Sequence, residues 1–100
     1  MKTPATADVA VSKAAVDNAT SAGGAEFAPV EMRSAREKMA LANKAMADKN
    51  YKLATDWANQ AQADAKLAQS KADTASAQAA SAAMQDNIRI LREELERASK

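Results

Sequence analysis

The sequence predicts an all-α fold, an antiparallel three-helix arrangement whose long third helix extends as a coiled coil. Alanine, the best helix former, supplies 28 of the 47 apolar residues. The glycines and prolines are Pro4, Gly23, Gly24 and Pro29, which leaves residues 51–100 without a helix breaker. Because 100 residues is the length of one small domain, we expect residues 1–100 to form a single helical domain.

The first helix is predicted at about residues 4–21. Thr3 is placed to act as N-cap with Pro4 at the first helical position, and Thr6 offers an alternative start. Small and apolar residues then recur at spacings of 4, 3, 4 and 3, which is typical of one helix face. These residues are Ala5, Val9, Ser12, Val16 and Ala19. Gly23 and Gly24 are expected to end the helix, because glycine adopts the left-handed geometry of a C-cap.

The second helix is predicted at about residues 29–48. Pro29 suits the first helical position, and Glu31 follows next to the positive end of the helix dipole. Phe27 and Met32 are spaced for a hydrophobic staple across this N-terminus. Large and small residues alternate along the expected buried face, which consists of Met32, Ala35, Met39, Ala42 and Met46. The short links at 22–28 and 48–50 favour sequential antiparallel neighbours.

The third helix is predicted at about residues 51–98, with Asn50 or Asp48 as its cap. At 1.5 Å per residue it would be about 73 Å long, against about 30 Å for the second helix. Residues 70–98 are therefore expected to project. A strict alternation of three- and four-residue spacings marks its inner face, which consists of Tyr51, Ala54, Ala58, Ala61, Ala65, Ala68, Ala72, Ala75, Ala79 and Ala82. The candidate core of the whole domain is Val9, Val16, Phe27, Met32, Met39, Met46, Tyr51, Ala54, Trp57, Ala58, Ala61 and Ala65.

After Ala82 the apolar pattern of the third helix changes phase and chemistry. The new stripe is Met84, Ile88, Leu91 and Leu95, at spacings of 4, 3 and 4. A straight third helix would leave these bulky side chains uncovered, so they are the candidate interaction residues. Self-association is the favoured interpretation. Folding back after a break near Ser81 and binding of a different protein are the alternatives.

Four stretches of the chain resemble a known family. They are residues 24–29 (GAEFAP), 34–39 (SAREKM), 50–54 (NYKLA) and 58–68 (ANQAQADAKLA). In order and spacing they resemble the bacterial domain-of-unknown-function family numbered 4398, over about residues 5–97. The family's second turn usually has glycine where this chain has Lys49, so we expect that turn to use Asn50 or an ordinary right-handed geometry.

The resemblance implies an envelope protein of Gram-negative bacteria, without an established activity. Family members commonly carry a lipoprotein signal, and some place this module ahead of an OmpA-like peptidoglycan-binding domain. The implied location is periplasmic, with an outer-membrane anchor in the natural precursor. The implied partners are peptidoglycan-associated or other envelope proteins. Here Met1 and Lys2 are followed at once by Thr3 and Pro4, so no signal peptide is visible.

Composition argues against catalysis and cofactors. The chain has no cysteine and no histidine, which removes thiolate chemistry and the commonest general base and metal ligand. Asp56, Asp64 and Asp73 are spaced by eight and nine residues, at least about 12 Å along a helix, too far apart to share an ion. We therefore expect no catalytic, metal-binding or cofactor-binding residues and no enzymatic activity.

Charge and hydropathy restrict the partners. Net charge is +1, without the basic footprint of a nucleic-acid-binding protein. No run approaches the roughly 18 apolar residues of a membrane span, so direct membrane insertion is not expected. The expected function is a non-enzymatic periplasmic interaction module that self-associates through its C-terminal helix, with a dimer favoured. The alternative is a monomeric adaptor that binds a different envelope protein through residues 84–95.

Overall fold

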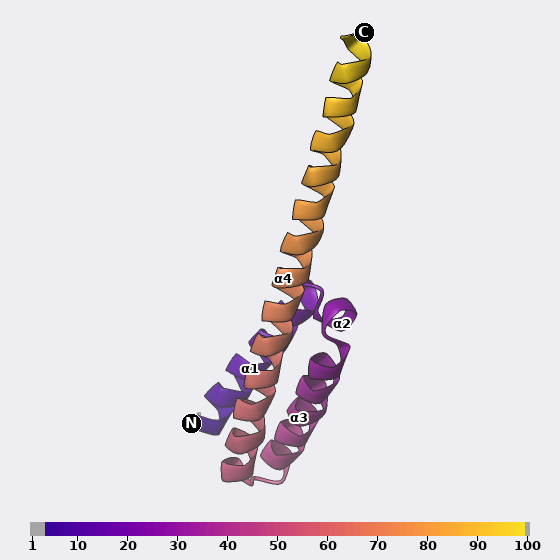
Figure 1. Cartoon of the computed structure of the whole chain (residues 1–100). Helices are drawn as coiled ribbons and strands as arrows, with labels where there is room; N and C mark the ends of the chain where they lie inside the picture. Colours follow the sequence, from indigo (N-terminus) through magenta and orange to yellow (C-terminus); the bar gives the residue numbers. More distant parts are fainter. Residues whose placement is uncertain (1–3, 100) are drawn as a thin grey trace.

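The computed structural model describes residues 4–99, which form four helices and confirm the all-α fold class. The helices are α1 (Pro4–Ser21), α2 (Gly24–Phe27), α3 (Pro29–Ala47) and α4 (Tyr51–Ala98). Helices α1 and α3 lie along the first half of α4, while its second half leaves the bundle alone (Figure 1). The molecule is accordingly elongated, with extents of 77 × 24 × 13 Å. Because α4 is continuous, the alternative of a break near Ser81 is wrong.

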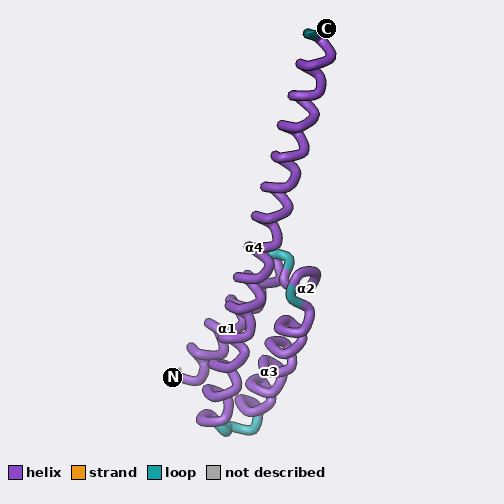
Figure 2. Tube along the Cα trace, viewed as in Figure 1, coloured by secondary structure: helices purple, strands orange, loops and turns teal. Residues whose placement is uncertain are grey.

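The first turn contains a one-turn helix, α2, where the sequence predicts a link (Figure 2). Gly23 has φ 95°, its N–H donates to the Thr20 carbonyl at 3.1 Å, and its own carbonyl accepts from Phe27 N–H at 3.0 Å. Gly24 is needed for a different reason. A Cβ on it would lie 2.7 Å from Met32 Sδ and 2.8 Å from the Ala19 carbonyl oxygen. The expected Thr3 cap lies outside the described residues.

The second turn places Lys49 in a left-handed conformation, with φ 60°. The expectation of a right-handed turn or of Asn50 at this position is therefore wrong. Two hydrogen bonds satisfy the last carbonyls of α3: Lys49 N–H donates to Met46 at 3.0 Å, and Asn50 N–H to Ala45 at 2.8 Å. They offset a conformational cost of about 1–2 kcal/mol for a residue with a Cβ. Asn50 also caps α4, since its Oδ1 accepts from Leu53 N–H at 3.3 Å.

The core of the bundle is made mainly of alanine. In α4 all the buried residues are alanines, and they follow the predicted spacing: Ala54, Ala58, Ala61, Ala65, Ala68 and Ala72. Small side chains let helices approach closely, and Met32 and Met39 of α3 fill the space beside them. The buried Ser12 hydroxyl of α1 donates to the Ala58 carbonyl of α4, so the one buried polar side chain among the described residues is satisfied.

Two aromatic residues expected in the core are half exposed. Phe27 and Tyr51 are each 41% exposed. Phe27 ends α2, and its ring lies against Gly23 on the outside of the turn, where a Cβ on Gly23 would be 3.2 Å from it. Tyr51 is the first residue of α4, at the edge of the bundle. Val9, Met46 and Trp57 are partly buried, and Ala45 takes the fully buried position expected for Met46.

Candidate functional site: an interaction surface on the projecting helix

The bundle covers α4 only as far as its middle. Ala72 is its last buried residue, and Ala75 is partly buried. Every residue from 76 to 98 is exposed, and we call this range the projecting segment. Figure 1 shows it as a single helix with no other element beside it. A helix usually gains most of its stability by packing an amphipathic face, so an apolar face here lacks its usual partner.

Four bulky side chains form a stripe along the projecting segment. We name this set, Met84, Ile88, Leu91 and Leu95, the apolar stripe. Their exposed fractions are 65%, 44%, 58% and 68%. The structure therefore leaves all the predicted interaction residues accessible to solvent on one helix.

The apolar stripe does not continue the buried face of α4. Met84 follows Ala72 by twelve residues, which is three and one third turns at 3.6 residues per turn. The stripe is thus rotated by about a third of a turn from the alanine face that holds α1 and α3. A second helix can approach the stripe without meeting the bundle.

Ile90 is a large exposed residue that the predicted stripe omits. It is 42% exposed, nearly the same as Ile88, but two residues of helix separate their directions by about 200°. No apolar neighbour at helical spacing joins it, so it lies outside the stripe. Around it, Arg89 and Glu93 form an i,i+4 ion pair of 3.0 Å, one of the pairs typical of a solvated helix face.

Ion pairs between α3 and α4 hold the base of the projecting segment. Lys71 Nζ lies 2.8 Å from Glu31 Oε1, and Lys38 Nζ lies 2.9 Å from Asp64 Oδ2. Ser34 also donates to Asp64 Oδ2 at 2.7 Å. Glu31 and Lys71 join the beginning of α3 to the last covered turn of α4. This ion pair helps to orient the projecting segment relative to α3.

These contacts lower the pKa of both carboxyl groups. The hydrogen bond from Lys71 lowers the pKa of Glu31 below its ordinary 4.5. For Asp64, partial burial raises the pKa, but the hydrogen bonds from Lys38 and Ser34 outweigh burial and leave the pKa below its ordinary 3.8. Both groups are therefore stabilised as carboxylates in the folded protein.

A family model described as Domain of unknown function (DUF4398) matches residues 7–84. The chain belongs to this family. No curated protein and no solved structure matches the chain. The match covers the DUF4398 bundle and ends at Met84, so the stripe residues Ile88, Leu91 and Leu95 lie beyond it. The resemblance expected over about residues 5–97 is thus confirmed over 7–84.

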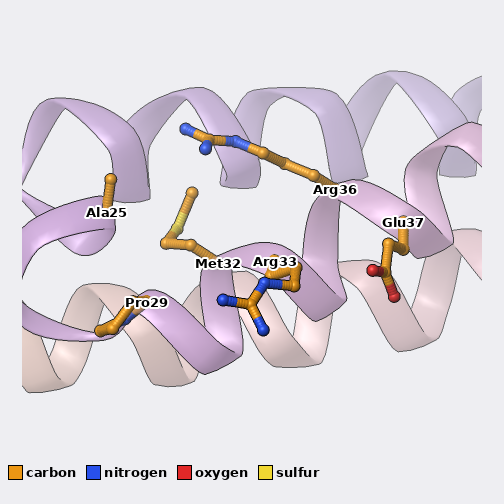
Figure 3. Close-up of a pocket in the computed structure, with 6 residues that line it drawn as sticks. All are labelled: Ala25, Pro29, Met32, Arg33, Arg36 and Glu37. Atoms are coloured by element: carbon orange, nitrogen blue, oxygen red, sulfur yellow. The ribbon is translucent and has the colours of Figure 1, made fainter.

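The DUF4398 bundle has an open hollow of about 340 Å³ beside the start of α3, which no sequence pattern indicates. In Figure 3, Met32 lies between the side chains of Arg33 and Arg36, with Glu37 at the far end of the hollow from Pro29. Arg36 Nη2 already donates to Thr20 Oγ1 at 3.2 Å. Charges of both signs line the hollow, so it does not select for an anion.

A second hollow of about 240 Å³ lies at the turn between α3 and α4. It is lined by Leu41, Lys44, Ala45, Asp48, Asn50, Leu53 and Trp57. Apolar side chains meet one lysine and one aspartate here, without paired acids or a nucleophile and base.

The acidic residues of the described range do not form a metal-binding cluster. Within residues 4–99, no group of three or more potential metal ligands is present. Asp64 is engaged by Lys38 and Ser34, as described above. No helix in this range is both long and apolar enough to cross a bilayer.

Proposed function

We propose that the protein is a non-enzymatic assembly and spacer module of the bacterial periplasm. It self-associates through the apolar stripe and is tethered to the envelope in its full-length form. The bundle of α1, α3 and the first half of α4 provides a stable base, and the projecting segment brings copies together at a distance from it.

The observation that supports this proposal is the exposed apolar stripe on an otherwise unpaired helix. Its spacing of 4, 3 and 4 residues is the a/d pattern by which helices pair. A helix that remains unpaired in water gains no stability from bulky apolar side chains aligned at this spacing. Isolated exposed apolar residues such as Ile90 are, in contrast, common on protein surfaces.

The size of the stripe sets the expected strength of association. Complete burial of one such side chain contributes about 1.5–3 kcal/mol, and about half of the surface is still exposed on average. Four residues on each of two copies thus offer on the order of 6–12 kcal/mol per dimer, against an association cost of about 4–15 kcal/mol. We expect a weak dimer, with a Kd on the order of micromolar or weaker.

A weak dimer fits an envelope-tethered protein. Anchoring copies in one surface raises their effective concentration, so a stripe too small for tight binding in dilute solution suffices there. The periplasmic setting itself is supported by the resemblance to envelope proteins of Gram-negative bacteria. The lack of cysteine and histidine supports a non-enzymatic role.

The test is the solution mass by light scattering over a concentration series up to about millimolar, the weak end of the expected affinity range. The native chain is expected to shift from monomer to dimer as concentration rises. The double variant Ile88→Asp/Leu91→Asp is expected to stay monomeric, because two carboxylates in the seam must be desolvated on pairing.

A matched control comes from the two neighbouring isoleucines. Ile88→Asp and Ile90→Asp add the same charge to equally exposed positions two residues apart. Only Ile88→Asp should weaken association, and circular dichroism should show both variants equally helical. A native chain that is monomeric throughout would overturn self-association and favour an adaptor that binds a different envelope protein. An equal effect of both variants would remove the stripe as the interface.

Location is tested separately by fractionating the native host and detecting the full-length protein. Recovery in the periplasmic or outer-membrane fraction is expected. Recovery in the cytoplasm would overturn the envelope part of the proposal and leave the assembly part to the scattering experiment.

A further inference from the structure

We infer that two copies of the chain pair through the apolar stripe as a parallel, in-register, two-stranded coiled coil, which places both bundles at the same end. This inference rests on the proposed function and specifies the geometry of the same surface. It follows from the heptad positions of the stripe, from the charges on its two flanks and from the position of the bundle.

The stripe residues occupy alternating a and d positions of a heptad. Ile88 and Leu95 fall at a, and Met84 and Leu91 fall at d. A β-branched residue at a beside leucine at d favours two strands in parallel coiled coils. The same heptad continues through exposed small residues, with Ala77 at d and Ser81 at a. An in-register pair therefore matches every bulky layer with itself and extends the contact toward the bundle.

Each flank of the stripe carries one charge within the projecting segment, and the two charges have opposite signs. Position e bears Gln78, Gln85 and Arg92, whereas position g bears Ala80, Asn87 and Glu94. One flank is thus neutral to basic, and the other is neutral to acidic. Parallel helices bring e of one copy against g of the other, so unlike flanks meet on both sides, with Asn87 facing Arg92 of the second copy. Antiparallel helices would bring each flank against its own kind.

The bundle leaves room for this pairing. Helix α3 is fixed to α4 through Asp64 and Lys71, and α1 through Ala58. The stripe faces about a third of a turn away from that covered side. Two bundles at the same end of the coiled coil therefore do not cover the face of α4 through which the two copies pair.

The same heptad predicts where the pairing stops. Lys66 at g would face Lys71 at e of the second copy, and like charges at these positions disfavour pairing. Lys71 is on the last covered turn of α4, where it binds Glu31. The coiled coil is thus confined to the projecting segment.

The test uses cysteines, because the native chain has none. Ser81→Cys changes one small a residue and leaves all four stripe residues in place. In a parallel pair, Cys side chains at 81 share a layer and can form a disulfide. The matched control is Ser76→Cys, the same exchange at an exposed c position on the outer side. After equilibration in a glutathione redox buffer, position 81 is expected to give roughly tenfold more linked dimer than position 76.

Mixing Ser81→Cys with Ala98→Cys distinguishes the orientations. In the antiparallel alignment that pairs the bulky residues, 81 lies opposite 98, and the two 81 positions are about 25 Å apart along the helix. Mass spectrometry is expected to find 81–81 and 98–98 links and no 81–98 link. A dominant 81–98 link would overturn the parallel arrangement and leave self-association standing. A native dimer by light scattering with equal linkage at 76 and 81 would overturn the stripe as the interface and the parallel arrangement with it. A monomeric native chain would overturn self-association as well.

Discussion

The two halves of α4 differ in what covers them and in where their apolar residues lie. In the bundle half, the buried residues are all alanines, whereas in the projecting half Met84, Ile88, Leu91 and Leu95 stand in solvent. A helix of an isolated globular domain buries its large apolar residues and exposes its small and polar ones. This distribution indicates that close helix approach holds the bundle together, and that the four aligned side chains of the projecting half serve a surface outside it.

The largest expected effect separates the bundle from the projecting segment through two methionines. Met32 is 1% exposed and fills the space under Gly24, whereas Met84 is 65% exposed. Met32→Ala is expected to lower the free energy of unfolding by about 2–5 kcal/mol, because it leaves a cavity among rigid helices. Met84→Ala should change it by less than about 0.5 kcal/mol. Urea unfolding followed by circular dichroism, at a concentration where the chain is monomeric, measures both. Equal losses would contradict the contrast between the packed bundle and the projecting segment.

The next expected effect comes from adding volume instead of removing it. Ala65 is fully buried in the bundle, whereas Ala79 continues the same alanine pattern into solvent. Ala65→Leu is expected to cost about 1–3 kcal/mol, because three extra carbons force α1 and α3 away from α4. Ala79→Leu should be nearly neutral, since leucine is also a good helix former. Thermal unfolding of the two variants checks this, and a tolerated Ala65→Leu would show that the bundle is not closely packed.

Most of the architecture was predictable because it depends on local signals. Pro29 and the glycine pair mark the first turn, and the alanine spacing in α4 correctly identifies its buried residues from Ala54 to Ala72. The spacing does not predict at which residue α1 and α3 cease to cover α4, since Ala75, Ala79 and Ala82 continue the same spacing. Only the lengths of α1 and α3 determine that limit.

The errors arose where tertiary geometry decides. Phe27 was expected in the core as the staple partner of Met32, and Tyr51 as the first residue on the inner face of the third helix. Both lie at the ends of their helices and are half exposed. Lys49 adopts a glycine-like conformation because hydrogen bonds across the turn require it. In the candidate site, the stripe residues were found from spacing, and the same spacing correctly leaves out Ile90, which points about 200° away from Ile88.

The smallest expected effect concerns the ion pairs between α3 and α4. The folded pKa values of Glu31 and Asp64 lie below their ordinary values of 4.5 and 3.8. Their contribution to stability is therefore complete above those values and is lost as the pH falls through the lower folded ones. The free energy of unfolding of the native chain should decrease as the pH is lowered below about 4.5, the ordinary range of these carboxyl groups.

One substitution in each half of α4 tests which carboxyl groups cause this acid dependence. Asp64→Asn removes the bonds from Lys38 and Ser34, and is expected to lower stability by about 1 kcal/mol at pH 7 and to flatten the decline in acid. Glu93→Gln removes an ion pair within the projecting segment, where both partners are exposed, and should leave unfolding of the bundle unchanged. If Glu93→Gln flattened the decline as much as Asp64→Asn, the projecting segment would unfold in the same cooperative transition as the bundle. The two halves of α4 would then differ in structure but not in stability.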